Sequence, residues 1–176
     1  RVLEDGFVMS SLNALSHEVN KKGYFLMINT TADIREIPVF ASMWNMDGLI
    51  LMGFCEADYE KLRNQMRISF VVYDGYFEKC SKVVNLVIDH FDGGFQAGEY
   101  LKQLGHKKAL RFQMIGFDDS AASRESRPAL TTIRQDPVLR AKSAIECIEA
   151  MRDGRNCEEK ILLPVELIKR ESTRKL

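Results

Sequence analysis

The sequence predicts an α/β fold with a mainly parallel sheet. Short, almost wholly apolar runs alternate along the chain with segments whose apolar residues recur every three or four positions. The first pattern is typical of strands that helices cover on both faces, and the second is typical of amphipathic helices. Turn residues such as Asp and Gly follow most of the apolar runs, which supports the division into separate strands.

The first elements are a helix and two strands. The predicted helix ends at Gly23, where a glycine can cap it, and its inner stripe consists of Val8, Leu12, Leu15 and Val19. Residues 24–29 (YFLMIN) are an apolar run and predict a buried strand. A second strand is predicted at residues 49–52, between Asp47-Gly48 and Gly53, and polar, helix-favouring residues follow at 56–65.

The middle of the chain repeats this alternation. Residues 69–73 (SFVVY) predict a strand that Asp74-Gly75 ends, and residues 83–88 contain another strand. Gly93-Gly94 opens a helix that Gly105 ends. Its inner stripe consists of Ala97, Gly98, Leu101 and Leu104.

In the last part of the chain, the sequence predicts a strand, then a helix, then a final strand. Residues 109–117 form the first of these strands. Pro137 suits the first turn of a helix that stops near Gly154, with Ala141, Ala144, Ile145, Ile148 and Met151 on one face. Residues 161–168 predict the last strand, and Pro164 places it at a sheet edge or a bulge.

Composition excludes several classes of protein. The 176 residues suffice for one good-sized core or for two small lobes. Lys and Arg together number 25, as do Asp and Glu, so the chain offers no general positive field for a nucleic-acid backbone. No apolar run is long enough to span a bilayer, and we expect no membrane partner. The scattered Cys55, Cys80, Cys147 and Cys157 predict reduced thiols in a cytoplasmic protein, and no metal site.

Acidic residues gather at the predicted strand ends. Asp74 follows one strand, Asp89 and Asp92 follow another, and Asp118-Asp119 follow a third. Ligands of open α/β sheets bind at the carboxyl ends of the strands, and one carboxylate can accept hydrogen bonds from two hydroxyl groups. The pattern therefore predicts a pocket for a polyhydroxylated ligand, although Asp is also a common turn residue. Asp118 and Asp119 are neighbours, so we expect their side chains to point to different sides.

Motifs of catalysis and of cofactor binding are missing. The sequence contains neither G-x-G-x-x-G nor G-x-x-x-x-G-K-[ST], and it has no G-x-S-x-G elbow. We therefore predict no catalytic residues, no cofactor and no enzymatic activity.

Six blocks, in order along the chain, carry a family resemblance. They are residues 48–51 (GLIL), 88–94 (IDHFDGG), 104–108 (LGHKK), 115–120 (IGFDDS), 128–136 (PALTTIRQD) and 162–164 (LLP) with 170–173 (REST). Together they resemble the effector-binding core of the lactose-repressor/galactose-repressor family of bacterial transcription regulators. The resemblance implies a two-lobed periplasmic-binding-protein-like fold, with parallel sheets flanked by helices and a small ligand in the cleft.

The resemblance also implies a division of the chain. Residues 1–107 are mainly the first lobe, residues 108–133 are a remnant of the second lobe with crossovers, and residues 134–176 return toward the first lobe. Between Phe112 and Gln113 the family carries further β-α units, so the second lobe is expected to be incomplete here. We interpret this point as a seam where segments have been removed, because a native deletion would uncover apolar surface.

Five residues are implied as effector ligands. Asp118 matches a strand-end residue of the second lobe that commonly contacts effector, and Asp92 matches a sugar-binding carboxylate of some members. Asp5-Gly6-Phe7 aligns with a loop that usually reads Asn-Pro-Phe, which makes Asp5 and the aromatic Phe7 candidates. Asp74 follows the strand where the family often reads Asp-Arg, with Gly75 in place of the Arg.

The resulting functional hypothesis is a ligand-sensing core that couples a small polar effector, a sugar or sugar derivative, to operator binding. The implied partners are this effector, a second copy of the chain in a homodimer, and operator DNA through an amino-terminal helix-turn-helix head that is absent from the sequence. One alternative is the solute-binding protein of a sugar transporter, which the scattered cysteines and the block at 128–136 disfavour. The other is a flavodoxin-like α/β enzyme working at the acidic strand ends.

Overall fold

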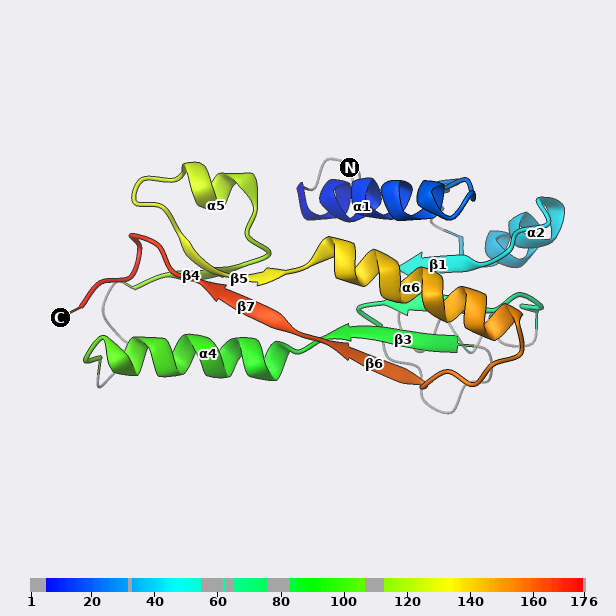
Figure 1. Cartoon of the computed structure of the whole chain (residues 1–176). Helices are drawn as coiled ribbons and strands as arrows, with labels where there is room; N and C mark the ends of the chain where they lie inside the picture. Colours follow the sequence, from blue (N-terminus) through cyan, green and yellow to red (C-terminus); the bar gives the residue numbers. More distant parts are fainter. Residues whose placement is uncertain are drawn as a thin grey trace. The chain divides into compact units, whose positions relative to one another are not determined.

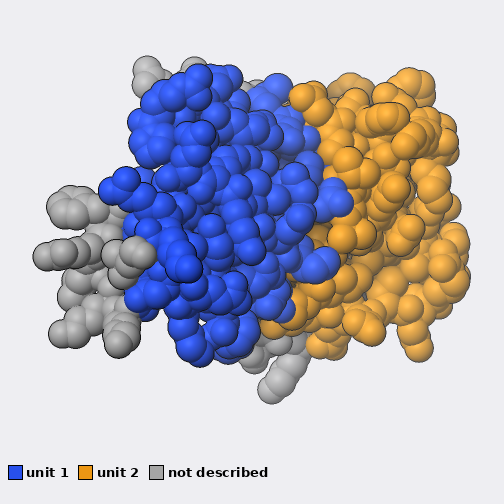
Figure 2. Space-filling view, turned by 60° about the vertical axis from the view of Figure 1, so that its left-hand side comes forward, with its two compact units in different colours: residues 1–12, 88–137, 164–176 blue, residues 13–87, 138–163 orange. Residues whose placement is uncertain are grey.

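The chain separates into two compact units, each with its own sheet. The computed structural model describes residues 6–31, 33–54, 62, 65–75, 83–106 and 113–175. Unit 1 comprises residues 1–12, 88–137 and 164–176, and unit 2 comprises residues 13–87 and 138–163 (Figures 1 and 2). The lobe boundaries implied by the family resemblance remain a prediction.

Unit 2 contains a sheet with the strand order β1-β2-β3-β6. The strands are β1 (Leu49–Met52), β2 (Phe70–Tyr73), β3 (Val83–Ile88) and β6 (Lys160–Leu163). β1 pairs with β2 and β2 with β3 in parallel, and every residue of β2 is buried. The three apolar runs at 49–52, 69–73 and 83–88 are therefore the strands that the sequence predicts. Their side chains fill a core with Leu51, Phe70, Val72, Val83, Ile37 and Leu62.

Helix α6 (Pro137–Arg152) extends through most of unit 2, as its start and stop signals predict. It packs closely against the turn before β1: a Cβ at Gly48 would lie 2.2 Å from Cγ2 of Ile148. Glycine at this turn therefore lets the helix approach the sheet. Helix α1 (Gly6–Lys21) also confirms its prediction, whereas α2 (Glu36–Met43) is not predicted because Pro38 interrupts its apolar pattern.

Unit 1 contains a sheet with the strand order β4-β5-β7. β4 (Ile115–Phe117) is parallel to β5 (Thr131–Gln135), and β7 (Val165–Ile168) is antiparallel to β5. Helix α4 (His90–Gln103) lies against β7, and the short helix α5 (Ala121–Glu125) begins after the Ser120 cap (Figure 1). The Asp89 side chain caps α4 by accepting a hydrogen bond from the Asp92 amide at 2.8 Å, so this helix starts earlier than Gly93-Gly94 suggests.

The prediction of a buried strand at residues 24–29 is wrong. This run forms no strand, and Phe25, Met27 and Ile28 are exposed, with Phe25 at 95%, while Tyr24 and Leu26 are half-buried. A strand needs a neighbouring backbone to pair with, and no strand in the described part of the chain pairs with this run. The apolar pattern alone therefore misidentifies it.

The predicted strand at residues 161–168 is two strands in different units. β6 belongs to unit 2 and β7 to unit 1, and Pro164 separates them. Proline has no backbone N–H to donate to a ladder, so it is a natural point for the chain to leave one sheet and join another.

Two further predictions differ from the structure. Within 109–117 only Ile115–Phe117 is a strand, while residues 107–112, and with them the seam at Phe112, lie outside the described residues. β5, the central strand of unit 1, is not predicted because TTIRQ looks too polar, yet Thr131 and Thr132 are fully buried. Most of the predicted helix at 56–65 also lies outside the described part of the chain.

Candidate functional site

The candidate site of unit 1 lies at the carboxyl ends of β4 and β5. After Phe117 the backbone enters the left-handed region at Asp118 (φ 74°) and Asp119 (φ 47°), which aspartate tolerates better than most residues. Gly116 lets Leu130 pack closely just before this turn, because a Cβ there would lie 2.7 Å from Cδ2 of Leu130. Strand and turn together therefore place two carboxylates in sequence at the sheet end.

Asp118 faces the neighbouring strand end. Its Oδ1 accepts a hydrogen bond from Nε2 of Gln135, the last residue of β5. Both side chains stand at the same sheet edge because β4 and β5 are parallel, with Phe117 paired to Ile133. Gln135 is a site residue that the sequence does not reveal, since the strand that carries it is not predicted.

Asp119 turns to the interior and has different partners. Its side chain is 4% exposed and forms ion pairs with Arg170, and with Arg124 at 3.4 Å. Arg170 also donates from Nη1 to the Leu130 carbonyl at 2.8 Å. The two adjacent aspartates thus have different roles. Asp119 stabilises the turn through its buried ion pair, whereas Asp118 lies half-buried at the strand end.

Asp92 lies in the first turn of α4, also in unit 1. Its Oδ2 accepts a hydrogen bond from Nε2 of Gln96 at 2.7 Å. Gln96 in turn donates to the Val165 carbonyl at 3.1 Å and accepts from the Leu167 amide at 3.0 Å. The backbone of β7 therefore orients Gln96, and Gln96 orients Asp92.

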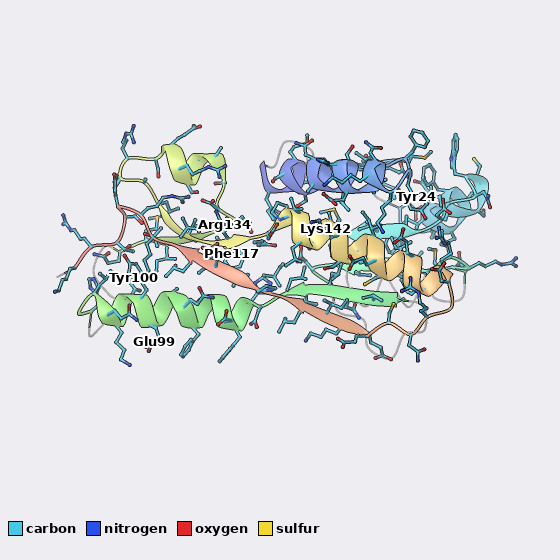
Figure 3. The ribbon with its side chains drawn as sticks, viewed as in Figure 1. Tyr24, Glu99, Tyr100, Phe117, Arg134 and Lys142 are labelled. Atoms are coloured by element: carbon cyan, nitrogen blue, oxygen red, sulfur yellow. The ribbon has the colours of Figure 1, made fainter. Side chains whose placement is uncertain are left out.

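Phe117 connects the first turn of α4 to the β4 strand end. The His90 and Phe117 rings are 5.5 Å apart, and a Cβ at Gly93 would lie 3.6 Å from the Phe117 ring. Figure 3 shows Phe117 beside the strands of unit 1. Because Phe117 precedes Asp118, the structure brings the regions of Asp92 and Asp118 together at one end of unit 1.

Asp74 lies in unit 2 and pairs with a buried cation. Its Oδ2 is 2.6 Å from Nη2 of Arg140, whose side chain is 1% exposed. The guanidinium lies over the Tyr73 ring, 4.1 Å from its centre, and the Tyr73 hydroxyl donates to the Arg140 carbonyl at 3.2 Å. Burial is the main cause that raises the pKa of Tyr73 above its usual value. Arg140 is not singled out by the sequence, because it lies within an ordinary helix pattern.

The other two candidates lie at the start of the chain. Phe7 is in the first turn of α1 and is half-buried, whereas Asp5 lies outside the described residues. Within the described ranges there is no group of three His, Cys, Asp or Glu side chains that could hold a metal ion. In the same ranges no helix is both long and apolar enough to cross a bilayer.

The architecture of this chain is similar to that of several solved transcriptional regulators. Residues 99–173 match the model of the periplasmic binding protein-like domain. A periplasmic binding protein/LacI transcriptional regulator from Alkaliphilus metalliredigens, complexed with D-xylulofuranose, superposes with a TM-score of 0.74 at 17% identity, over 96% of this chain and 95% of that one. The chain has the periplasmic-binding-protein-like fold.

Two more structures share this periplasmic-binding-protein-like fold. The lac repressor dimer bound to operator and an anti-inducer has a TM-score of 0.83 at 15% identity, over 98% of this chain and 79% of that one. A LacI family regulator from Enterococcus faecium with bound ribose has a TM-score of 0.77 at 16% identity, over 99% and 96%. These similarities confirm the predicted α/β fold and its resemblance to the lactose-repressor core. A comparison with curated protein sequences finds no match.

Proposed function

We propose that this chain is the ligand-sensing core of a bacterial DNA-binding transcriptional regulator, without enzymatic activity, and that its effector is a small sugar or sugar derivative. The observation that carries the proposal is the grouping of Asp118, Gln135 and Asp92 at one end of unit 1, in a fold whose solved relatives include regulators with bound sugars. Carboxylate and amide side chains at a strand end suit the hydroxyl groups of a sugar.

Regulation follows from linkage between two binding equilibria. An effector that binds one arrangement of the protein more tightly favours that arrangement, and operator affinity changes with it. A coupling free energy of about 1–3 kcal/mol changes operator affinity about 5- to 150-fold. Equal numbers of basic and acidic residues, 25 each, suit a core that leaves DNA contact to a helix-turn-helix head. Such a regulator works in the cytoplasm, where operator DNA is.

The effector assignment predicts that Asp118→Asn weakens sugar binding. We expect D-ribose, D-xylulose or cellobiose to raise the Tm of the wild-type protein, since a ligand of the folded state stabilises it. Loss of one charged hydrogen bond, worth about 1.5–3 kcal/mol, raises Kd about 10- to 150-fold. Isothermal titration calorimetry with the stabilising sugar measures this change.

The matched control for Asp118 is Glu99→Gln. Glu99 is on α4 of the same unit and pairs with Lys102 at 3.2 Å in an exposed position (Figure 3). This change removes a carboxylate away from the strand end, so Kd should stay within about twofold of wild type. Equal Kd values for Asp118→Asn and wild type would contradict the role of Asp118, and the absence of a Tm shift with any sugar would contradict the sugar-sensor function.

The homodimer has a candidate contact surface on unit 2. Val39, Met43 and Trp44, on and just after α2, are 60%, 70% and 54% exposed, and the Trp44 ring lies 6.2 Å from that of Phe40. An exposed apolar cluster of this kind marks interaction surfaces. A second copy of the chain is the partner that the regulator function requires.

This surface predicts that Val39→Asp with Met43→Asp gives a monomer. Burying carboxylates without partners costs free energy, so the dissociation constant of the dimer should increase at least about 100-fold. Sedimentation equilibrium measures it. Phe91→Asp, at an apolar side chain of unit 1 that is 85% exposed, should leave the dimer intact. A wild-type monomer at micromolar concentration, or a dimeric double variant, would argue against this surface.

A further inference from the structure

Two cysteines of unit 2 lie beside each other. Cys147 is buried in α6, and Cys157 is half-buried in the segment that leads to β6. The Cys157 thiol donates toward the Cys147 carbonyl, with the sulfur 3.7 Å from that oxygen. The pKa of Cys147 is raised to about 12, mainly by burial, with further contributions from the charges of Cys157 and Glu146 and from a hydrogen bond with the Cys157 side chain. The thiols are therefore direct neighbours.

The end of α6 explains why they meet. Gly154 adopts the left-handed conformation (φ 71°), and its amide donates to the Met151 carbonyl at 3.3 Å. The Arg155 amide donates to the Ala150 carbonyl at 2.8 Å, which completes a glycine-capped helix end. This turn reverses the chain direction, so the segment after it runs back along the last turns of α6 and brings Cys157 to Cys147.

We propose that Cys147 and Cys157 form a reversible disulfide when the protein meets a disulfide oxidant such as oxidised glutathione. The two residues are ten positions apart, and the bond would join the carboxyl end of α6 to the segment before β6. This site is independent of the sugar site and of the proposed regulatory function.

The reaction is a two-step thiol–disulfide exchange. The more accessible Cys157 thiolate attacks one sulfur of oxidised glutathione, the S–S bond of glutathione breaks, and one glutathione thiolate leaves. The Cys147 thiol then loses its proton to solvent. The resulting thiolate attacks Sγ of Cys157 and displaces the second glutathione thiolate. The two cysteines lose two electrons in total, and oxidised glutathione is reduced to two thiols.

The test uses the Cys55→Ser/Cys80→Ser protein, in which only these two cysteines remain. After incubation with oxidised glutathione, we expect a product lighter than the reduced protein by two hydrogen atoms, with no retained glutathione. Peptide mapping should join the peptides of Cys147 and Cys157. The same mapping on the wild-type chain gives the answer if the double variant does not fold.

Single replacements in that background assign the steps. In the Cys147→Ser variant, one glutathione should stay bound to Cys157 as a stable mixed disulfide. The Cys157→Ser variant should react slowly with oxidised glutathione, because its remaining cysteine, Cys147, is buried. The equilibrium constant for disulfide formation should be at least about tenfold larger in the folded protein than in urea, because folding holds the thiols together. Glutathione retained on both cysteines of the folded protein, or an equilibrium constant no larger than in urea, would overturn the proposal.

Discussion

Arg170→Met is expected to lower the free energy of unfolding by about 3–4 kcal/mol, because it breaks a buried ion pair in unit 1. Arg170 forms the ion pair with Asp119, whose side chain is 4% exposed, and it also bonds the Leu130 carbonyl. Methionine keeps much of the side-chain volume but leaves the Asp119 carboxylate with longer contacts, to Arg124 at 3.4 Å and to the Ser123 hydroxyl at 3.5 Å. Urea unfolding followed by circular dichroism measures the change.

Two further variants separate charge from packing at this site. Arg170→Met combined with Asp119→Asn should recover at least about half of the lost free energy, because the carboxylate no longer lies buried. Arg134→Met removes the same kind of side chain from an exposed pair with Glu166 at 2.5 Å, and should cost less than about 1 kcal/mol. An effect of Arg170→Met as small as that of Arg134→Met would mean that the buried pair does not hold the turn.

Asp74→Asn is expected to lower the free energy of unfolding by about 2–3 kcal/mol, by the same physics in unit 2. Arg140 is 1% exposed, so its positive charge would stay buried without this carboxylate, whereas Asp74 itself is 43% exposed. Asparagine keeps the shape of the side chain and tolerates the left-handed backbone at this position (φ 57°). The replacement therefore changes the charge and little else, and urea unfolding measures its effect.

A double variant and a surface control complete this test. Asp74→Asn combined with Arg140→Met should be more stable than Asp74→Asn alone, because no buried cation remains. Asp153→Asn, which affects exposed pairs with Arg152 and Arg155, should change stability by less than about 1 kcal/mol. If the double variant were no more stable than Asp74→Asn, the burial of the Arg140 charge would not explain the loss.

The two acidic candidates of unit 1 and the one of unit 2 therefore differ in surroundings. Asp118 and Asp92 accept hydrogen bonds from the neutral amides of Gln135 and Gln96, which a ligand hydroxyl can join or replace. Asp74 pairs with the buried guanidinium of Arg140 and so stabilises unit 2. The part of Asp74 in effector binding stays a prediction, as do those of Phe7 and Asp5.

The sequence by itself was enough for the elements whose signals are local. β1, β2, β3 and α6 have, to within about two residues, the bounds that their apolar runs, turns and caps predict, because these patterns depend on residues a few positions apart. The acidic strand ends Asp118 and Asp92 were also visible in this way, and ordered blocks of sequence indicated the periplasmic-binding-protein-like fold that the comparisons confirm.

Only the tertiary structure decided features that depend on distant partners. The run at 24–29 is apolar but pairs with no strand among the residues that the structure describes, while the polar run of β5 is buried at the centre of its sheet. The ion pair of Asp119 and Arg170 joins residues 51 positions apart, and the approach of Gln135 to Asp118 needs two parallel strands in register. Strand pairing and charge burial depend on contacts between residues far apart in the sequence, so local composition does not predict them.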